Sequence, residues 1–293
     1  MAIQKTGLQV DTNSNFTNPL IYEENGQVNH IVADNLTPST RYFARAYVVS
    51  DGTTYPSQSY LSFTTLTPSY LSFENRTGVQ AVLTLNKYGS PADIVLEYSV
   101  DNGETWDQAD MAGITDYDFY IEDGEILLLR GTTNTTFSEG PTDYYYFSAL
   151  QTLYVGGDVR TLVDPTGSID TIPCDYCFTH LFDGMDLMVV TDLTLQAETL
   201  TEGCYSYMFA NCSNMGTPMV ILAVHPELYC FDNMFFNCGG FDEVTIWVDT
   251  YDTDYFTSWL KGCAAQGIVW NLGGAALPTD TDDGIPENWV EYN

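Results

Sequence analysis

The sequence predicts a mainly β protein, with two β-sandwich-like modules followed by a short solenoid of stacked repeats. In residues 1–160, apolar and polar residues alternate in short runs, as half-buried strands require. Turn-forming Gly, Asp and Asn residues separate these runs. After residue 170, a pattern of Cys and Phe recurs at a nearly constant spacing, which is typical of a solenoid.

Composition supports folded modules and excludes one class of partner. Of the 293 residues, 44% are hydrophobic and 14% aromatic, which is enough for packed cores. The chain has 8 Lys and Arg against 40 Asp and Glu, a formal net charge of -32. Such a surface repels phosphate backbones, and the basic residues form no stripe. We therefore expect no binding to nucleic acid.

The N-terminal residues lack a charged segment followed by an apolar one, and no apolar run reaches the roughly 18 residues that span a bilayer. We expect synthesis and folding in a cytoplasm, without membrane insertion. All seven cysteines lie between Cys174 and Cys263. In a reducing compartment they are expected to be thiols, and an odd number cannot all pair within one chain.

Residues 1–66 form the first expected module. Tyr42, Ala44, Ala46 and Val48 alternate with residues of the opposite face, and Asp51-Gly52 predicts a hairpin turn. The Leu-x-Pro-x-Thr-x-Tyr spacing that ends at Tyr42 resembles the tyrosine corner of fibronectin type III domains. This resemblance implies a structural role for Tyr42.

The first module is short for such a domain, because only about 35 residues precede the corner and two strands are missing. One explanation is that a partner chain, or a second copy of this one, completes the sandwich by strand addition. The other is that residues 1–30 wrap differently and close the module. The sequence leaves both open.

Residues 67–165 form the second expected β-sandwich module, with strands in 81–85, 94–100, 126–130 and 144–147. Ser99-Val-Asp-Asn-Gly-Glu-Thr-Trp106 fits the Asp-box pattern. In this pattern Asp101 closes a turn and Trp106 caps the core, so both are expected to be structural. Asp-boxes resemble those of sialidases, but one copy and few Arg argue against that activity.

Residues 166–272 hold the repeats, whose copies start 25 to 27 residues apart at Cys177, Cys204, Cys230 and Tyr255. Each copy has a short helix-like or turn segment, a connection and a β run, so stacking is expected to produce a parallel ladder. Two internal columns of structural cysteines are expected. The first contains Cys177, Cys204 and Cys230, and the second contains Cys212, Cys238 and Cys263. Residues 273–293 read as an acidic tail.

No pattern typical of an enzyme is present. There is no Gly-x-Ser-x-Gly elbow and no phosphate-binding loop. Cys174-x-x-Cys177 lacks the second ligand pair that zinc requires. The acidic clusters 249–254 and 280–283 could take Ca²⁺, but neither fits an EF-hand loop, and solvated loops are the preferred interpretation. We expect no enzymatic activity and no cofactor.

The Cys-[Tyr/Phe]-x-x-[Met/Leu]-Phe-x-Asn-Cys repeat resembles the BspA-type leucine-rich repeat. The order of a fibronectin-like module, a β-sandwich and these repeats resembles surface and phage proteins of gut Bacteroidetes. Because phage proteins need no secretion signal, the resemblance implies a virion structural protein of a crAss-like or related phage: a head fibre, decoration or tail-associated component. The alternatives are a BspA-type bacterial adhesin and, more remotely, a glycan-active enzyme.

This interpretation implies a homo-oligomer, or contacts with other virion proteins, formed by the N-terminal module. The repeats would recognise a bacterial surface glycan or protein. Aromatic rings on a solenoid surface can make such contacts. The candidate binding residues are Tyr205, Tyr207, Trp247 and Trp270, and ordinary packing between repeats is the competing explanation for each.

Overall fold

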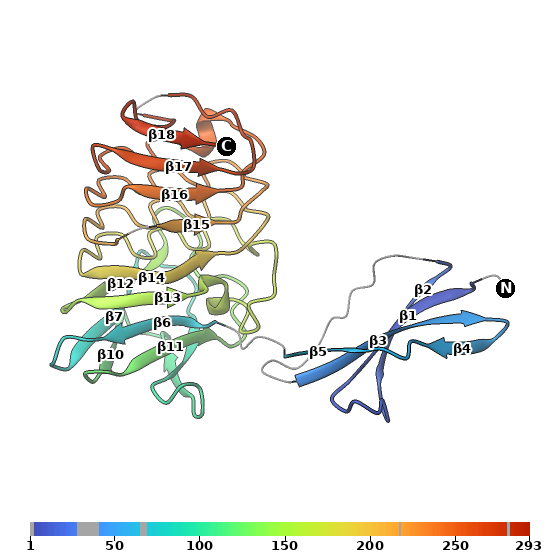
Figure 1. Ribbon diagram of the computed structural model, residues 1–293. Coiled ribbons are helices and arrows are strands. Elements are labelled where there is room, and N and C mark those ends of the chain that lie inside the picture. Colours follow the sequence, from blue (N-terminus) through green and yellow to red (C-terminus); the bar gives the residue numbers. More distant parts are fainter. Residues whose placement is uncertain (1–2, 28–40, 65–68, 217, 280–281) are drawn as a thin grey trace. The chain divides into compact units, whose positions relative to one another are not determined.

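The computed structural model describes residues 3–27, 41–64, 69–216, 218–279 and 282–293 and divides into two compact units, Met1–Pro68 and Ser69–Asn293 (Figure 1). Strands dominate both. The helices of the described residues are two single 3-10 turns, η1 (Val159–Leu162) and η2 (Thr253–Tyr255). The prediction of a mainly β protein is confirmed, and each unit is described by itself.

The first unit contains one antiparallel sheet of five strands. They are β1 (Lys5–Asp11), β2 (Leu20–Asn25), β3 (Arg41–Ser50), β4 (Thr53–Pro56) and β5 (Leu61–Thr64). The order is β2-β1-β3-β4, and β5 also pairs with β3. Asp51 and Gly52 both have positive φ, 53° and 74°, which matches the type I′ turn that a two-residue hairpin favours.

Tyr42 lies in β3 and is buried, with 6% of its surface exposed. Most of the tyrosine-corner pattern, from Leu36 to Thr40, lies outside the described residues. All the strands described in this unit belong to one sheet. Whether another chain completes a sandwich over this sheet stays a prediction.

The second unit contains a sheet of ten strands and a smaller sheet of three. The large sheet follows the order β18-β17-β16-β15-β14-β13-β6-β11-β8-β9, and the small one follows β10-β7-β12. The strands are β6 (Leu71–Asn75), β7 (Ala81–Tyr88), β8 (Val95–Ser99), β9 (Asp107–Asp110), β10 (Asp116–Ile121), β11 (Ile126–Gly131), β12 (Tyr144–Ala149), β13 (Leu153–Gly157), β14 (Met188–Leu195), β15 (Met219–Ile221), β16 (Glu243–Ile246), β17 (Gly267–Asn271) and β18 (Trp289–Tyr292).

The large sheet changes its pairing at β13. From β9 to β13 the strands are antiparallel, whereas from β13 to β18 they form a parallel ladder with one strand per repeat (Figure 1). The predicted solenoid-like stacking is therefore confirmed. The same sheet also joins the second expected module to the repeats within one compact unit.

The C-terminal segment differs from the expected acidic tail. Its last strand, β18, pairs in parallel with β17 and extends the ladder. Trp289 is 6% exposed, and its indole N–H donates to the Ala264 carbonyl at 2.8 Å. The acidic composition of residues 280–283 concealed this strand, because its apolar residues are too few to mark a repeat.

Opposite the strands, each repeat runs through consecutive turns rather than a helix. Alternate N–H groups bond to the next repeat, as when Phe182 N–H donates to the Met208 carbonyl at 2.8 Å. The others close local turns, as when Asp183 N–H donates to the His180 carbonyl at 3.0 Å. An α-helix would use all of these groups internally. We call these segments, 176–185, 203–212 and 229–238, the turn segments.

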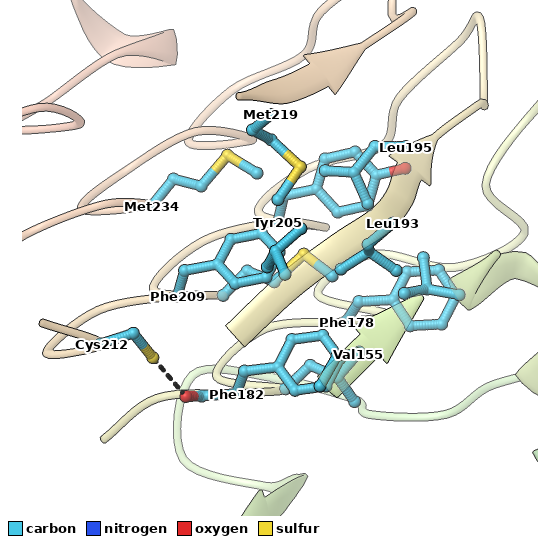
Figure 2. Close-up of a cluster of buried hydrophobic side chains, with 14 of the residues drawn as sticks. Val155, Phe178, Phe182, Leu193, Leu195, Tyr205, Phe209, Cys212, Met219 and Met234 are labelled. Carbon is cyan, nitrogen blue, oxygen red and sulfur yellow. Dashed lines mark hydrogen bonds between the residues drawn. The ribbon is translucent and has the colours of Figure 1, made fainter. Parts of the chain in front are cut away.

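A stack of phenylalanine rings fills the interior between strands and turn segments (Figure 2). The Phe182–Phe209 and Phe209–Phe235 ring centroids lie 5.4 and 5.5 Å apart, with nearly parallel planes. Phe147 of β12 stacks on Phe182 at 6.0 Å, and its N–H donates to the Leu181 carbonyl at 2.8 Å. The strand β12 thus occupies the place of a preceding turn segment and closes that end of the solenoid.

Candidate binding surface

Both expected columns of cysteines lie in or beside the core. Cys177, Cys204, Cys230, Cys212 and Cys238 are fully buried, and Cys263 is half-buried. In the second column each thiol donates to a Phe carbonyl of the preceding repeat. The Sγ–O distances are 2.9 Å for Cys212 to Phe182, 2.9 Å for Cys238 to Phe209 and 3.1 Å for Cys263 to Phe235. Burial raises the pKa of these thiols, so they stay protonated and serve packing.

The Asp-box residues hold a local hairpin. The Asp101 carboxylate accepts bonds from the Thr105 N–H at 2.9 Å, the Thr105 hydroxyl at 2.6 Å and the Ser99 hydroxyl at 2.7 Å. These bonds lower its pKa to about 2. The Trp106 indole donates to the Gly103 carbonyl, and the Arg130 guanidinium lies 3.8 Å from its ring centroid. These contacts show how the motif holds its hairpin.

The four candidate binding residues occupy different environments. Tyr205 is fully buried, and its hydroxyl has no hydrogen-bond partner within the described residues, so the expectation of a surface contact there is wrong. Tyr205 follows Cys204 in the second turn segment, and both side chains lie in the core. Trp247 is 40% exposed. Trp270 stacks on Tyr292 at 4.7 Å and donates to Glu243 Oε1 at 2.9 Å, which leaves only part of its ring free.

Tyr207 belongs to a row of stacked rings at the surface, which runs from the small sheet of the second unit to its first two repeats. The rings of Tyr88, Tyr144, His180 and Tyr207 stack in that order, with successive centroids 4.9, 4.2 and 4.7 Å apart. The angles between neighbouring planes are 15° to 19°. We call these four residues the aromatic row. Stacking covers both faces of the two inner rings and one face of each outer ring, so the ring edges are the more accessible parts.

The backbone dictates this row. Tyr88 and Tyr144 are direct partners in the β7–β12 pair, so their side chains lie on one face of the small sheet. His180 and Tyr207 occupy equivalent positions in successive turn segments, with φ of 56° and 54°. This left-handed conformation is uncommon for residues other than Gly, Asn, Asp and His, so Tyr207 is the more unusual of the two. It persists because the bonds to the next repeat hold the backbone on both sides.

A small polar pocket opens beside the row. Tyr88, Tyr144, Tyr146 and Asp183 line a cavity of about 230 Å³. The pKa of Tyr144 is raised to about 12, mainly by burial, and the nearby Asp183 carboxylate and the hydroxyls of Tyr88 and Tyr146 act in the same direction. The Tyr144 phenol therefore stays protonated at physiological pH, and a phenol can both donate and accept a hydrogen bond.

Asp183 is held in place from two sides. His180 Nδ1 lies 2.7 Å from Asp183 Oδ2, and Asn211 Nδ2 donates to Asp183 Oδ1 at 2.9 Å. Asn237 Nδ2 in turn donates to Asn211 Oδ1 at 3.1 Å, so the contact continues into the next repeat. One carboxylate thus stands at the pocket with a fixed orientation.

Sequence reasoning found one member of this surface, Tyr207, and missed Tyr88, Tyr144, His180 and Asp183. The missed residues come from separate segments, and only the packing of β12 on the first repeat brings them together. One signal was available: His180 occupies in the first repeat the position that Tyr207 occupies in the second. Two planar rings at equivalent positions indicate stacking.

In each expected acidic cluster, one described carboxylate makes another contact. Asp252 accepts the N–H of Asp254 at the start of η2, and Asp282 pairs with Lys261 at 2.6 Å. Across the described ranges, no group of three or more His, Cys, Asp or Glu side chains is placed to hold a metal ion. In those same ranges, no helix is long and apolar enough to cross a membrane.

Comparison with known proteins adds no relative: no family model, no curated protein and no solved structure matches the chain.

Proposed function

We propose that this chain is a non-enzymatic virion structural protein, of the head-fibre, decoration or tail-associated type. It docks or oligomerises through residues 1–66 and presents its repeats for recognition of a host-surface glycan or protein. The virion assignment rests on the resemblance of the repeat pattern and of the order of modules. The finer fold assignments belong to the same proposal: a partial fibronectin type III-like module, an Ig-like sandwich and BspA-type leucine-rich repeats.

The surface around the aromatic row is the observation that carries the recognition role. The solenoid interior is filled by Phe182, Phe209 and Phe235, whose rings leave no room for a ligand between them. Contacts with a partner are therefore made on the outside. There the aromatic row crosses β7, β12 and two repeats and provides an extended, rigid surface.

The docking role of the first unit is supported by apolar residues in its sheet. Leu20, Val10, Ala44 and Leu61 pair in sequence across β2, β1, β3 and β5, so their side chains share one face. Leu20 is 46% exposed and Leu61 77% exposed. A second copy or another virion protein that covers this face would remove both side chains from water.

The oligomeric state of the full chain tests docking through this face. By light scattering behind size exclusion we expect a dimer or trimer, and Leu61→Asp should shift it toward monomer. Leu187→Asp, at an exposed site of the second unit, is the matched control. A monomer that also fails to bind other virion proteins would contradict the docking role.

The second candidate function is a BspA-type adhesin of a bacterial surface, which the same repeats would serve. Localisation separates the two. Immunogold labelling with an antibody to the chain should mark phage particles if the proposal holds, and bacterial envelopes if the adhesin interpretation is correct. A hydrolysis assay on the glycans that the protein binds tests the remaining, enzymatic alternative.

A further inference from the structure

We propose that the pocket between Tyr88, Tyr144, Tyr146 and Asp183 binds a cationic group, the ammonium or guanidinium of a Lys or Arg side chain on a basic partner protein. This inference rests on the proposed recognition role and names the chemistry of the partner. The partner would present a basic segment to the aromatic row.

The stacking of the row determines which atoms meet a ligand. Tyr144 is covered on one face by Tyr88, at 4.9 Å, and on the other by His180, at 4.2 Å. Neither face of Tyr144 is open to a flat sugar ring. The pocket is lined by three tyrosines, each of which carries a hydroxyl group, and by the carboxylate residue Asp183.

Charge selects the ligand class. In the described part of the chain, Asp183 contacts the His180 ring, which is charged only when it is protonated, and no Lys or Arg pairs with it. The nearby Lys87 pairs with Asp93 instead. The two donors to Asp183 use one lone pair on each oxygen, and a carboxylate has about four such sites. The Asp183 carboxylate repels an anion. It attracts a cation, because no Lys or Arg of the described residues neutralises it.

The size and surroundings of the pocket fit the end of one side chain. A cavity of about 230 Å³ has room for an ammonium or guanidinium group with a few waters. Phenol oxygens can accept hydrogen bonds from those N–H groups of the ligand that do not bond to the carboxylate. The net charge of -32 attracts basic partners from a distance and raises their rate of encounter.

A peptide titration of the full-length protein tests the inference. The probe is tetralysine with blocked ends, and its fully side-chain-acetylated form is the uncharged control, both followed by NMR at about 0.15 M salt to screen distant charges. We expect tetralysine, and not the acetylated peptide, to shift the Tyr144 and Tyr146 ring signals. Equal shifts with both peptides, or none with either, would overturn the inference.

Variants distinguish the pocket from general attraction to an acidic protein. Asp183→Asn keeps the shape of the side chain and should weaken tetralysine binding about tenfold, as expected for a lost hydrogen bond to a charged group. Asp242→Asn removes the same charge at an exposed site outside the pocket and should leave affinity within about twofold. Equal losses in the two variants would mean non-specific attraction and overturn the inference.

A second variant guards against a folding defect. Tyr146→Phe removes one hydroxyl and keeps the ring, so binding should weaken while the tryptophan signals of the second unit stay unchanged. Unchanged binding would show that the phenol rim makes no contact. The proposed function has separate readouts, because oligomeric state and immunogold labelling do not depend on the pocket. The inference about the pocket can therefore be wrong while the proposed function is correct, and the proposed function can be wrong while the pocket binds a cation.

Discussion

The two units of this chain use β-strands in different ways. In the described part of the first unit, the buried apolar side chains are Val10, Tyr42 and Tyr47 of its single sheet and Phe16 of the connection between β1 and β2. In the second unit each repeat packs its strand and turn segment onto the previous repeat, and the phenylalanine stack runs through them. The comparison teaches that a small sheet depends on whatever covers it, whereas stacked repeats cover one another.

The tryptophans make this comparison measurable. All five lie beyond residue 100, so their fluorescence follows the second unit alone. Amide NMR signals of residues 5–25 follow the first. If the units unfold independently, a substitution in one should leave the transition of the other unchanged.

The largest expected effect comes from opening the phenylalanine stack. Phe209→Ala leaves a cavity between Phe182 and Phe235 and should lower the free energy of unfolding of the second unit by about 3–5 kcal/mol. Denaturant unfolding followed by tryptophan fluorescence measures this loss. Leu187→Ala, at a residue 40% exposed, is the control and should change stability by less than about 0.5 kcal/mol. A small loss for Phe209→Ala would mean that the stack does not stabilise the solenoid.

A substitution at Val10 is the corresponding test in the first unit. Val10 is fully buried, and Val10→Ala removes two methyl groups, so a loss of about 2 kcal/mol is expected. The loss should appear in the amide signals of residues 5–25, with the tryptophan transition unmoved. If the tryptophan transition shifts as well, the units do not unfold independently.

Gly203 tests the left-handed positions of the turn segments. Its φ is 60°, and a Cβ there would lie 2.2 Å from the Tyr176 ring. Gly203→Ala should therefore cost about 1–3 kcal/mol through strain and displacement of Tyr176. Gly184→Ala is the matched control, since its φ is 73° and a Cβ would meet nothing within 4 Å. Equal losses would assign the whole effect to the backbone and none to Tyr176.

The second cysteine column should contribute less to the free energy of unfolding. Cys212→Ala removes the thiol bond to the Phe182 carbonyl and a buried sulfur, with an expected loss of about 1 kcal/mol. Cys263→Ala removes the same kind of bond at a half-buried position and should cost less. Thermal unfolding of both variants compares them. A larger loss at Cys263 would contradict the role of burial.

The smallest effect is local and depends on pH. The pKa of Asp101 is about 2 in the folded protein, below the ordinary value of 3.8. Its contribution to the Asp-box hairpin is thus fully present above the ordinary value and is lost as pH falls through about 2. The Thr105 amide shift, followed from pH 5 downward, should titrate with that midpoint, and Asp101→Asn should abolish the titration. A midpoint near 3.8 would mean that the carboxylate bonds do not hold in solution.

The positions of several strands along the chain were predictable from local patterns. The runs at 81–85, 126–130 and 268–270 coincide with β7, β11 and β17, because alternation marks a half-buried strand. The turn segments were harder to predict. Their spacing of apolar residues also fits a short helix. Consecutive turns form instead because alternate N–H groups bond to the next repeat.

The sequence by itself determined the period of the repeats and the cysteine columns, because each follows from residues at fixed spacing. It did not reveal the aromatic row, since the pairing of β7 with β12 and the seating of β12 on the first repeat place Tyr144 on His180. Nor did it reveal β18, whose apolar residues become a strand only where β17 offers a free edge. Contacts between segments distant in sequence leave no local pattern, and for that reason the tertiary structure alone decided where the aromatic row lies.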